Sequence, residues 1–356
     1  MGDGAGRAAR FERDGSTLRF GPAGSRTAVS ICSPRIIRVD LEVEGQAPGP
    51  SHLEPRAWAA TRFDALDGEP LRLSTGDLTI EVATDPVRLA FLDFAGARLL
   101  HEPIDGGMSA ESPRDGASRR VRACFAFSGE QHFYGLGQGG GGLDRLGTAR
   151  QLWNTQIGHG PGSDLGLPLL LSSRGYGLFF DNTSDAVVAI GRSDHGVRIV
   201  YTAEAGRLTW YFLMGPDLRG VMGEVAELLG RPSLPPRWAL GFIQSTRHFE
   251  DTAELRALPR TIREKRIPCD ALVFLSSYGE ALGWNRGVGH LEFQPELWPK
   301  PAAANRGDFS CSTGYSWVIT SKCCCLASSS SAAGFGQSSG WNSRCPTPRF
   351  HPSASP

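Results

Sequence analysis

Two clusters of aromatic and polar residues are the parts of this sequence best suited to binding a ligand. Trp153 and Asn154 are adjacent in a segment rich in glycine and proline, and Glu280 and Trp284 follow the apolar run at residues 271–275. An indole face can stack on a sugar ring, while amide and carboxylate groups hydrogen-bond its hydroxyls. The pattern therefore favours carbohydrate contacts by these four residues, with simple loop packing as the alternative for each.

A glycine-rich segment offers a second chemistry. Gly135–Gly140 has the spacing G-x-G-x-x-G, which binds dinucleotides when it joins a strand to a helix. Here further glycines follow and no helical pattern begins, so a glycine-rich loop in a β domain is favoured instead.

The cysteines do not predict a metal site or a disulfide framework. Cys323–Cys325 are adjacent, and three neighbouring thiolates cannot all reach one tetrahedral ion without strain. Cys32, Cys124 and Cys269 are scattered and are expected to be small apolar residues in strands. We expect no cofactor, no metal and a reducing, cytoplasmic location.

The elements that must position these residues are mostly strands up to about Met214. Ile37, Val39, Leu41 and Val43 alternate with polar residues, which places them on one face of a strand. Further strands are expected at residues 78–82, 122–127, 167–172, 177–181, 197–201 and 208–214. Short strands separated by turn residues indicate an antiparallel β-sandwich.

The pattern changes after the sandwich. A helix is expected over residues 217–229, with Val221, Val225, Leu228 and Leu229 on one face, followed by a proline linker through Arg237. A strand at 238–245, a helix from Asp251 that Pro259 should kink or interrupt, and a strand at 271–275 then make one βαβ unit.

Charge indicates which partners to expect, and composition indicates the character of the two ends of the chain. Lysine plus arginine equals aspartate plus glutamate, 37 each, so nothing favours nucleic acid or an anionic membrane as a partner. Residues 1–26 are expected to be a flexible arm. Residues 301–356 are rich in serine and cysteine without apolar periodicity, which indicates a low-complexity tail, disordered or translated out of frame.

Several motifs, in order, resemble glycoside hydrolase family 31, the retaining α-glucosidases and α-xylosidases. They are Phe133–Gly137, Trp153–Asn154, Tyr176–Asn182, Tyr211–Pro216, Leu229–Gly241, Ile262–Asp270 and Gly289–Pro299. The resemblance implies a mainly β chain: a galactose-mutarotase-like antiparallel β-sandwich at 27–237, then the first strands of an incomplete (β/α)8 barrel at 238–300. It also implies an α-glycoside as the ligand.

Some positions depart from the family pattern. Gln138 stands where the family usually has glutamate, and Gln156 where it often has aspartate. A carboxylate usually follows the second barrel strand, and Glu280 is a candidate for that role. The family's two catalytic aspartates map to no position here, so we expect an inactive fragment of a retaining hydrolase. A non-catalytic carbohydrate-binding sandwich is the alternative.

Overall fold

The structure is a computed structural model. It describes residues 11–274, apart from 23, 47–48, 112–118, 128, 155–164, 194–195 and 247–250, together with residues 319–320. The chain divides into two compact units between Arg231 and Pro232, inside the predicted proline linker.

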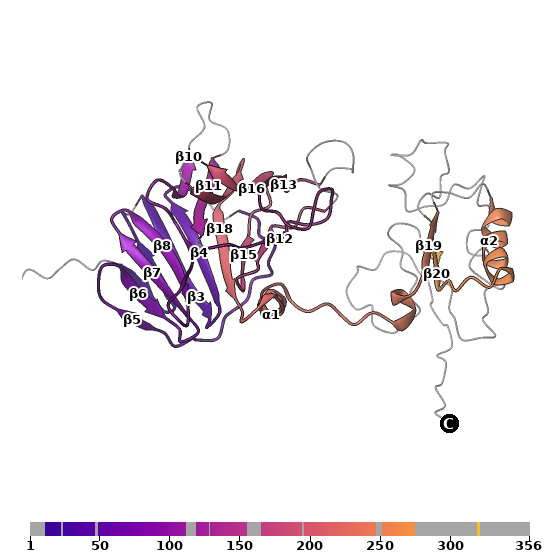
Figure 1. Ribbon diagram of the computed structural model, residues 1–356, viewed down its shortest axis with the longest axis horizontal. Coiled ribbons are helices and arrows are strands. Elements are labelled where there is room, and N and C mark those ends of the chain that lie inside the picture. The colour runs from indigo at the N-terminus through magenta and orange to yellow at the C-terminus, as the bar shows by residue number, and fades with distance from the viewer. Residues whose placement is uncertain are drawn as a thin grey trace, which may run out of the picture. The chain divides into compact units, whose positions relative to one another are not determined.

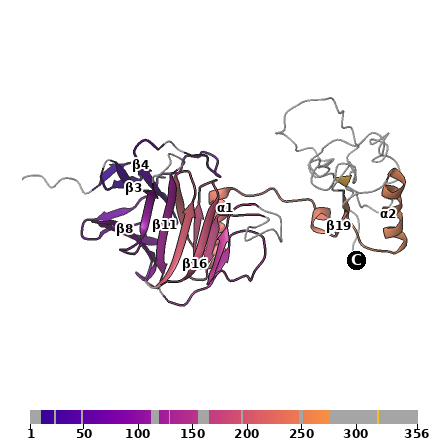
Figure 2. The same cartoon turned by 90° about the horizontal axis from the view of Figure 1, so that it is seen from above.

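The first unit is a sandwich of two antiparallel sheets (Figure 1, Figure 2). One sheet, here called the first sheet, has eight strands in the spatial order β1 (Glu12–Asp14), β2 (Thr17–Phe20), β3 (Ser25–Ser33), β4 (Ile36–Val43), β18 (Leu208–Met214), β15 (Tyr176–Phe180), β14 (Leu169–Ser172) and β12 (Phe133–Gly135). The second sheet runs β13 (Thr148–Gln151), β16 (Ala186–Ser193), β17 (Gly196–Ala203), β11 (Arg120–Phe127), β9 (Arg98–His101), β8 (Val87–Asp93), β7 (Leu78–Thr84), β6 (Leu71–Ser74) and β5 (Asp64–Leu66), with β10 (Gly107–Glu111) also paired to β11. The predicted β-sandwich is therefore confirmed.

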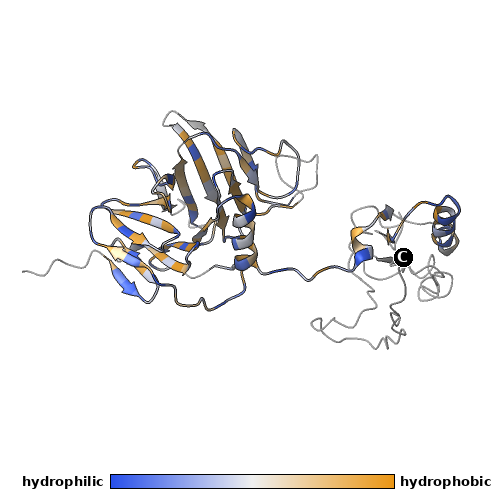
Figure 3. Ribbon diagram, turned by 60° about the horizontal axis from the view of Figure 1, so that its bottom comes forward, coloured by the Kyte–Doolittle hydropathy of each residue, from blue (hydrophilic) through white to orange (hydrophobic). Residues whose placement is uncertain are grey.

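The core lies between the two sheets. Ile37, Val39 and Leu41 face into it, as their alternation predicts, and the strands show the same banding of apolar and polar residues in Figure 3. Trp210 is fully buried at the centre, edge-on to Phe91 and Phe125 with ring centroids 5.6 Å and 4.8 Å away. Such aromatic pairs add to the free energy of apolar burial that holds the layers together.

A helix covers part of the outer face of the first sheet. α1 (Leu218–Leu229) begins at Asp217, whose side chain accepts a hydrogen bond from the Gly220 N–H, and ends before Gly230, which has φ 90°. Its Val221, Val225 and Leu228 pack on Tyr211 and neighbouring residues of the sheet. β18 is consequently buried along its whole length. Leu229, which the helical pattern placed on the buried face, is 41% exposed.

The flexible arm predicted for residues 1–26 is wrong over part of its length. Glu12–Asp14 and Thr17–Phe20 are strands β1 and β2, and Leu18 and Phe20 are buried in the core. β2 offers only two alternating apolar positions, Leu18 and Phe20, which are too few to show a strand pattern in the sequence.

The second unit begins with a turn where a strand was predicted. Residues 237–240 form a 3-10 helix, η1 (Arg237–Leu240), because the Ala239 and Gly241 N–H groups donate to the carbonyls of Pro236 and Trp238. The strand β19 (Ile243–Thr246) starts only after it. The helix α2 (Thr252–Glu264) runs through Pro259 without ending, and Asp251 caps it as predicted.

Three parallel strands follow one another across this unit. β19 pairs with β20 (Ala271–Phe274), and β20 pairs with β21 (Ile319–Thr320), both in parallel. The βαβ unit is confirmed. A third strand joins the two that were predicted, since β21 lies within the segment predicted to be a tail.

Among the described residues, no helix is long and apolar enough to cross a membrane.

Candidate functional site

The predicted sugar-contact residues of the sandwich lie just beyond an edge strand. β13 pairs with β16 at the edge of the second sheet and leads directly to Trp153 and Asn154. Trp153 is 50% exposed, so the residue is accessible from solvent. The Oδ1 atom of Asn154 accepts a hydrogen bond from the Gly166 N–H at 2.7 Å. This hydrogen bond holds Asn154 beside Gly166, a contact that the sequence did not reveal.

Glu280, Trp284 and Gln156 lie outside the described residues. The structure therefore places Trp153 and Asn154 together and does not test the other two predicted contacts.

The glycine-rich segment between β12 and β13 is a tight loop. A Cβ atom on Gly137 would overlap the carbonyl oxygen of Leu165, and one on Gly135 would overlap that of Leu169. Both glycines have positive φ, 85° and 101°, which favours glycine. The next element is a strand, so the favoured reading as a β-domain loop is confirmed and a dinucleotide site is not.

A hydrogen bond between two side chains ties this loop to the residue that precedes β12. The Nδ1 atom of His132 lies 2.7 Å from Oδ2 of Asp144, whose other oxygen accepts the N–H groups of Phe133 and Leu146. These hydrogen bonds, that from His132 foremost, lower the pKa of Asp144 to about 2. The same hydrogen bond and charge raise the pKa of His132.

A cleft that the sequence did not predict opens on the outer face of the first sheet. It has a volume of about 550 Å³ and is roofed by a strap, residues 49–58. Asp181 holds the strap, because its carboxylate accepts from Ser51 Oγ at 2.6 Å and from the His52 N–H at 2.7 Å. Arg56 stacks over Trp58 and pairs with Glu227 of α1.

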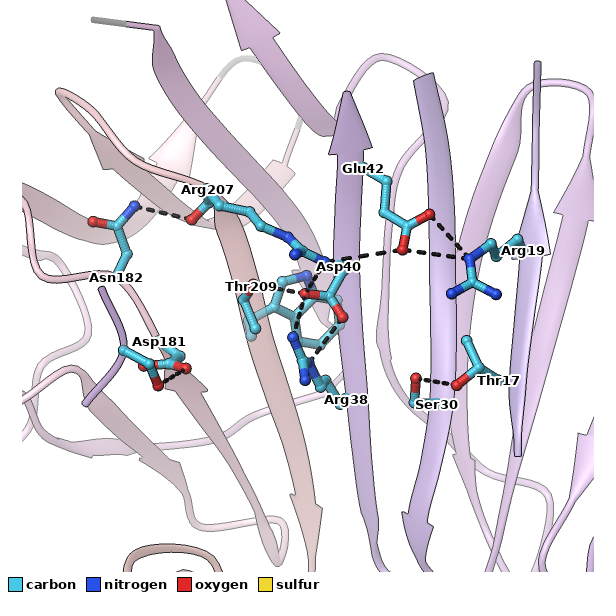
Figure 4. A network of polar contacts seen from close by, with 12 residues as sticks. Thr17, Arg19, Ser30, Arg38, Asp40, Glu42, Asp181, Asn182, Arg207 and Thr209 are labelled. Atoms are coloured by element: carbon cyan, nitrogen blue, oxygen red, sulfur yellow. Dashed lines mark hydrogen bonds and ion pairs between the residues drawn. The ribbon is translucent and has the colours of Figure 1, made fainter. Parts of the chain in front are cut away.

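Charged residues line the floor of this cleft and its margin (Figure 4). Asp40 has a side chain only 5% exposed and forms ion pairs with Arg38 and Arg207 at 2.8 Å each. It also accepts a hydrogen bond from Thr209 Oγ1 at 2.7 Å. Burial disfavours the charge on Arg38, but Asp40 outweighs that effect and raises the pKa of the guanidinium. Glu42 pairs with Arg19 at 3.1 Å.

The arrangement in the cleft suits binding better than acid–base chemistry. Both oxygens of Asp40 are engaged by arginine donors, so this carboxylate orders its neighbours rather than attacking a substrate. The signal for this network was present in the sequence, since residues 38, 40 and 42 fall on the face of β4 opposite its apolar side chains. Within the described residues, no group of three histidine, cysteine or acidic side chains could hold a metal. Cys32, Cys124 and Cys269 are free and buried, and burial raises the pKa of Cys32 to about 11.

Comparison with known proteins identifies both units. Residues 26–188 match the glycosyl hydrolase 31 N-terminal galactose mutarotase-like domain, and residues 232–319 match the glycosyl hydrolases family 31 TIM-barrel domain. The barrel match continues past residue 300, so the tail predicted from residue 301 was placed too early.

Curated relatives match over part of their length. Alpha-glucosidase 2 of Bacillus thermoamyloliquefaciens is 31% identical over 213 residues, which cover 57% of this chain and 26% of that protein. An alpha-xylosidase of Saccharolobus solfataricus is 29% identical over 192 residues, covering 51% of this chain and 24% of the relative. The chain thus spans about a quarter of the length of these relatives.

Solved structures share the fold. The GH31 dextranase of Flavobacterium johnsoniae, complexed with glucose, superposes with a TM-score of 0.68 at 22% identity, covering 87% of this chain and 38% of that one. A GH31 alpha-xylosidase from a soil metagenome, complexed with xylose, gives 0.69 at 20% identity, covering 83% and 45%. Sandwich, linker and parallel strands agree with these matches in kind and in order, and the chain belongs to glycoside hydrolase family 31, of which it carries the mutarotase-like sandwich and the beginning of the barrel.

Proposed function

We propose that this chain is the N-terminal part of a retaining α-glycoside hydrolase and that its sandwich contributes Trp153 to the sugar site. The observation that supports this most is the half-exposed Trp153 at the end of β13, next to an asparagine that is hydrogen-bonded to Gly166. An exposed indole beside hydrogen-bonding groups is suited to one face of a pyranose ring. Glu280 and Trp284 follow β20 in the sequence and are proposed as sugar contacts of the second unit, because segments after the C-terminal ends of parallel strands build barrel active sites.

We further propose that the chain does not hydrolyse glycosides by itself. Retaining hydrolysis needs two carboxyl groups about 5 Å apart, one as nucleophile and one as acid and base. The family resemblance places these on later barrel strands, and neither aspartate maps to a position in this sequence. The low-complexity tail predicted from residue 301, if translated out of frame, would begin after residue 319, where the match to the barrel domain ends.

The test uses aryl α-glucosides and α-xylosides as substrates and glucose, xylose and maltose as ligands. We expect no turnover above background, and weak sugar binding that Trp153→Ala reduces by about tenfold, the loss of one stacking contact. An exposed residue far from β13, such as Leu66 (60% exposed), provides the control variant Leu66→Ala. Turnover that is abolished by a substitution within this chain would refute the inactivity. Binding that Trp153→Ala leaves unchanged would remove the sandwich edge from the sugar site.

A further inference from the structure

Two arginines are buried beneath the glycine-rich loop. Arg145 is 8% exposed and Arg150 is 6% exposed. Arg145 follows the anchoring residue Asp144, while Arg150 is the one residue of β13 whose side chain is fully turned inward. The loop over them includes four consecutive glycines, residues 139–142, so no side chain covers the guanidinium groups from that segment.

The two guanidinium groups are held by backbone carbonyls. Arg145 donates from Nε to the Gly135 carbonyl at 3.0 Å and from Nη1 to that of Gly142 at 2.9 Å. Arg150 donates from Nη1 to the Gly140 carbonyl at 2.9 Å. The Nε and Nη2 atoms of Arg150 are buried and have no hydrogen-bond partner in the described part of the chain.

No acidic side chain among the described residues forms an ion pair with either arginine of this cluster. Between residues 136 and 154 the sequence contains one acidic residue, Asp144, and both its oxygens are engaged by His132, Phe133 and Leu146. Burial, and then the like charge of Arg145, lower the pKa of Arg150, whereas Asp40 raises that of Arg38. Arginine nevertheless stays protonated near neutral pH, so this buried positive charge has no counter-charge within the part of the chain that the structure describes.

The geometry of the unused donors specifies what would compensate that charge. Nε–H and Nη2–H lie on the same edge of a guanidinium and point in the same direction, which matches two oxygens of one carboxylate or phosphate. A buried polar group without a partner is costly, and a bound oxyanion would remove that cost. A Cβ atom on Gly140 or Gly142 would meet nothing within 4 Å, so no other part of the described chain covers the loop at these two positions.

We propose that Arg145 and Arg150 form a binding site for an oxyanion, a carboxylate or phosphate group, beneath the loop of residues 139–142. Arg150 is the fork that receives two oxygens of the ligand, and Arg145 adds the second positive charge. The oxyanion comes either from an anionic sugar, such as a uronic acid or a sugar phosphate, or from a free inorganic ion. Trp153, the predicted sugar contact, follows Arg150 by three residues and lies just after the end of β13.

The test is thermal unfolding of the full chain with added inorganic phosphate, glucuronate or glucose 6-phosphate. Glucose and sodium chloride at matched ionic strength are the controls, since they test the neutral sugar and general screening of charge. We expect a saturable rise in the unfolding temperature with the oxyanions only. A larger effect of the sugar-linked anions than of phosphate would assign the site to an anionic sugar, and equal effects would assign it to the bare ion.

Two variants connect the effect to the cluster. Arg150→Met keeps the aliphatic volume and removes the charge, and Arg62→Met changes an exposed arginine as the matched control. We expect Arg150→Met to weaken oxyanion binding at least tenfold while the ligand-free protein unfolds at the same or a higher temperature. Arg62→Met should bind like the parent chain.

Two results would overturn the proposal. One is the absence of any saturable shift with all three oxyanions in the unmodified chain, which is decisive even if the variant does not fold. The other is an equal shift in Arg150→Met.

Discussion

Arg38 and Arg207 line an open cleft on the first sheet, whereas Arg145 and Arg150 lie beneath a loop at the edge of the sandwich. In the cleft, Asp40 pairs with both arginines and Glu42 pairs with a third. Under the loop, backbone carbonyls are the acceptors, and two donors of Arg150 have none among the described residues. The positive charge of arginine is thus balanced by carboxylates in the cleft, whereas under the loop no described carboxylate balances it. The second arrangement is the one that an external ligand can complete.

Glu102 is a buried acidic residue that, like Arg150, forms no ion pair among the described residues. It gives the largest change in the free energy of unfolding that we expect. It is 5% exposed, accepts one hydrogen bond from the Leu89 N–H, and has a second oxygen without a partner in the described part of the chain. Burial raises the pKa of Glu102 to about 7. Since this folded-state pKa lies above the unfolded value, its contribution to stability is complete below about pH 4.5 and is lost as the pH rises through 7.

Glutamine stays neutral at every pH, so we expect the Glu102→Gln variant not to lose this stability as the pH rises. The free energy of unfolding of the parent chain should fall by about 3 kcal/mol relative to the variant between pH 4 and 8. Urea unfolding at four pH values in that range measures the difference. Parallel pH profiles for the two proteins would show that Glu102 is not an isolated buried charge.

Removing Asp40 should leave the arginines of the cleft without their shared carboxylate, as the arginines under the loop are. Asp40→Ala leaves Arg38 and Arg207 without this carboxylate, and we expect a loss of about 2 kcal/mol in the free energy of unfolding. This is less than for a fully buried pair, because both arginines keep some contact with water. Glu12→Ala, which removes an exposed ion pair with Arg26, is the control and should change stability little. If both variants lost the same amount, the compensation seen in the cleft would not stabilise the fold.

The smallest effect comes from the one uncharged donor to Asp40. Thr209→Val keeps the shape of the side chain and removes the hydroxyl that donates to the carboxylate, so we expect a loss of about 1.5 kcal/mol. Chemical denaturation measures it, and the double variant with Asp40→Ala should add little to Asp40→Ala alone. Fully additive losses would contradict a shared contact.

Local patterns predicted the strands and missed their partners. The alternation in residues 37–43 gave the core face of β4, but Asp40 meets Thr209 across a separation of 169 residues that no local pattern encodes. Trp153 was predicted as a sugar contact because its residue type is distinctive, and that prediction stays untested. The hydrogen bond from the Gly166 N–H to Asn154, twelve residues away in the sequence, is one that no local pattern encodes. The strand predicted from Trp238 failed because hydrogen bonds from two nearby N–H groups formed a turn instead. β21 has two residues, too few for a period.

The pairing of β4 with β18 determines when the first sheet can form during synthesis of the chain. Leu41 pairs with Leu208, so the middle of the first sheet cannot form until nearly all of the sandwich has left the ribosome. Until then β4 has an unpaired edge next to an apolar face, which is a template for association with other chains. The nascent sandwich is therefore most vulnerable to aggregation late in its synthesis, just before Leu208–Met214 emerges, and a pause in translation there would prolong the exposure.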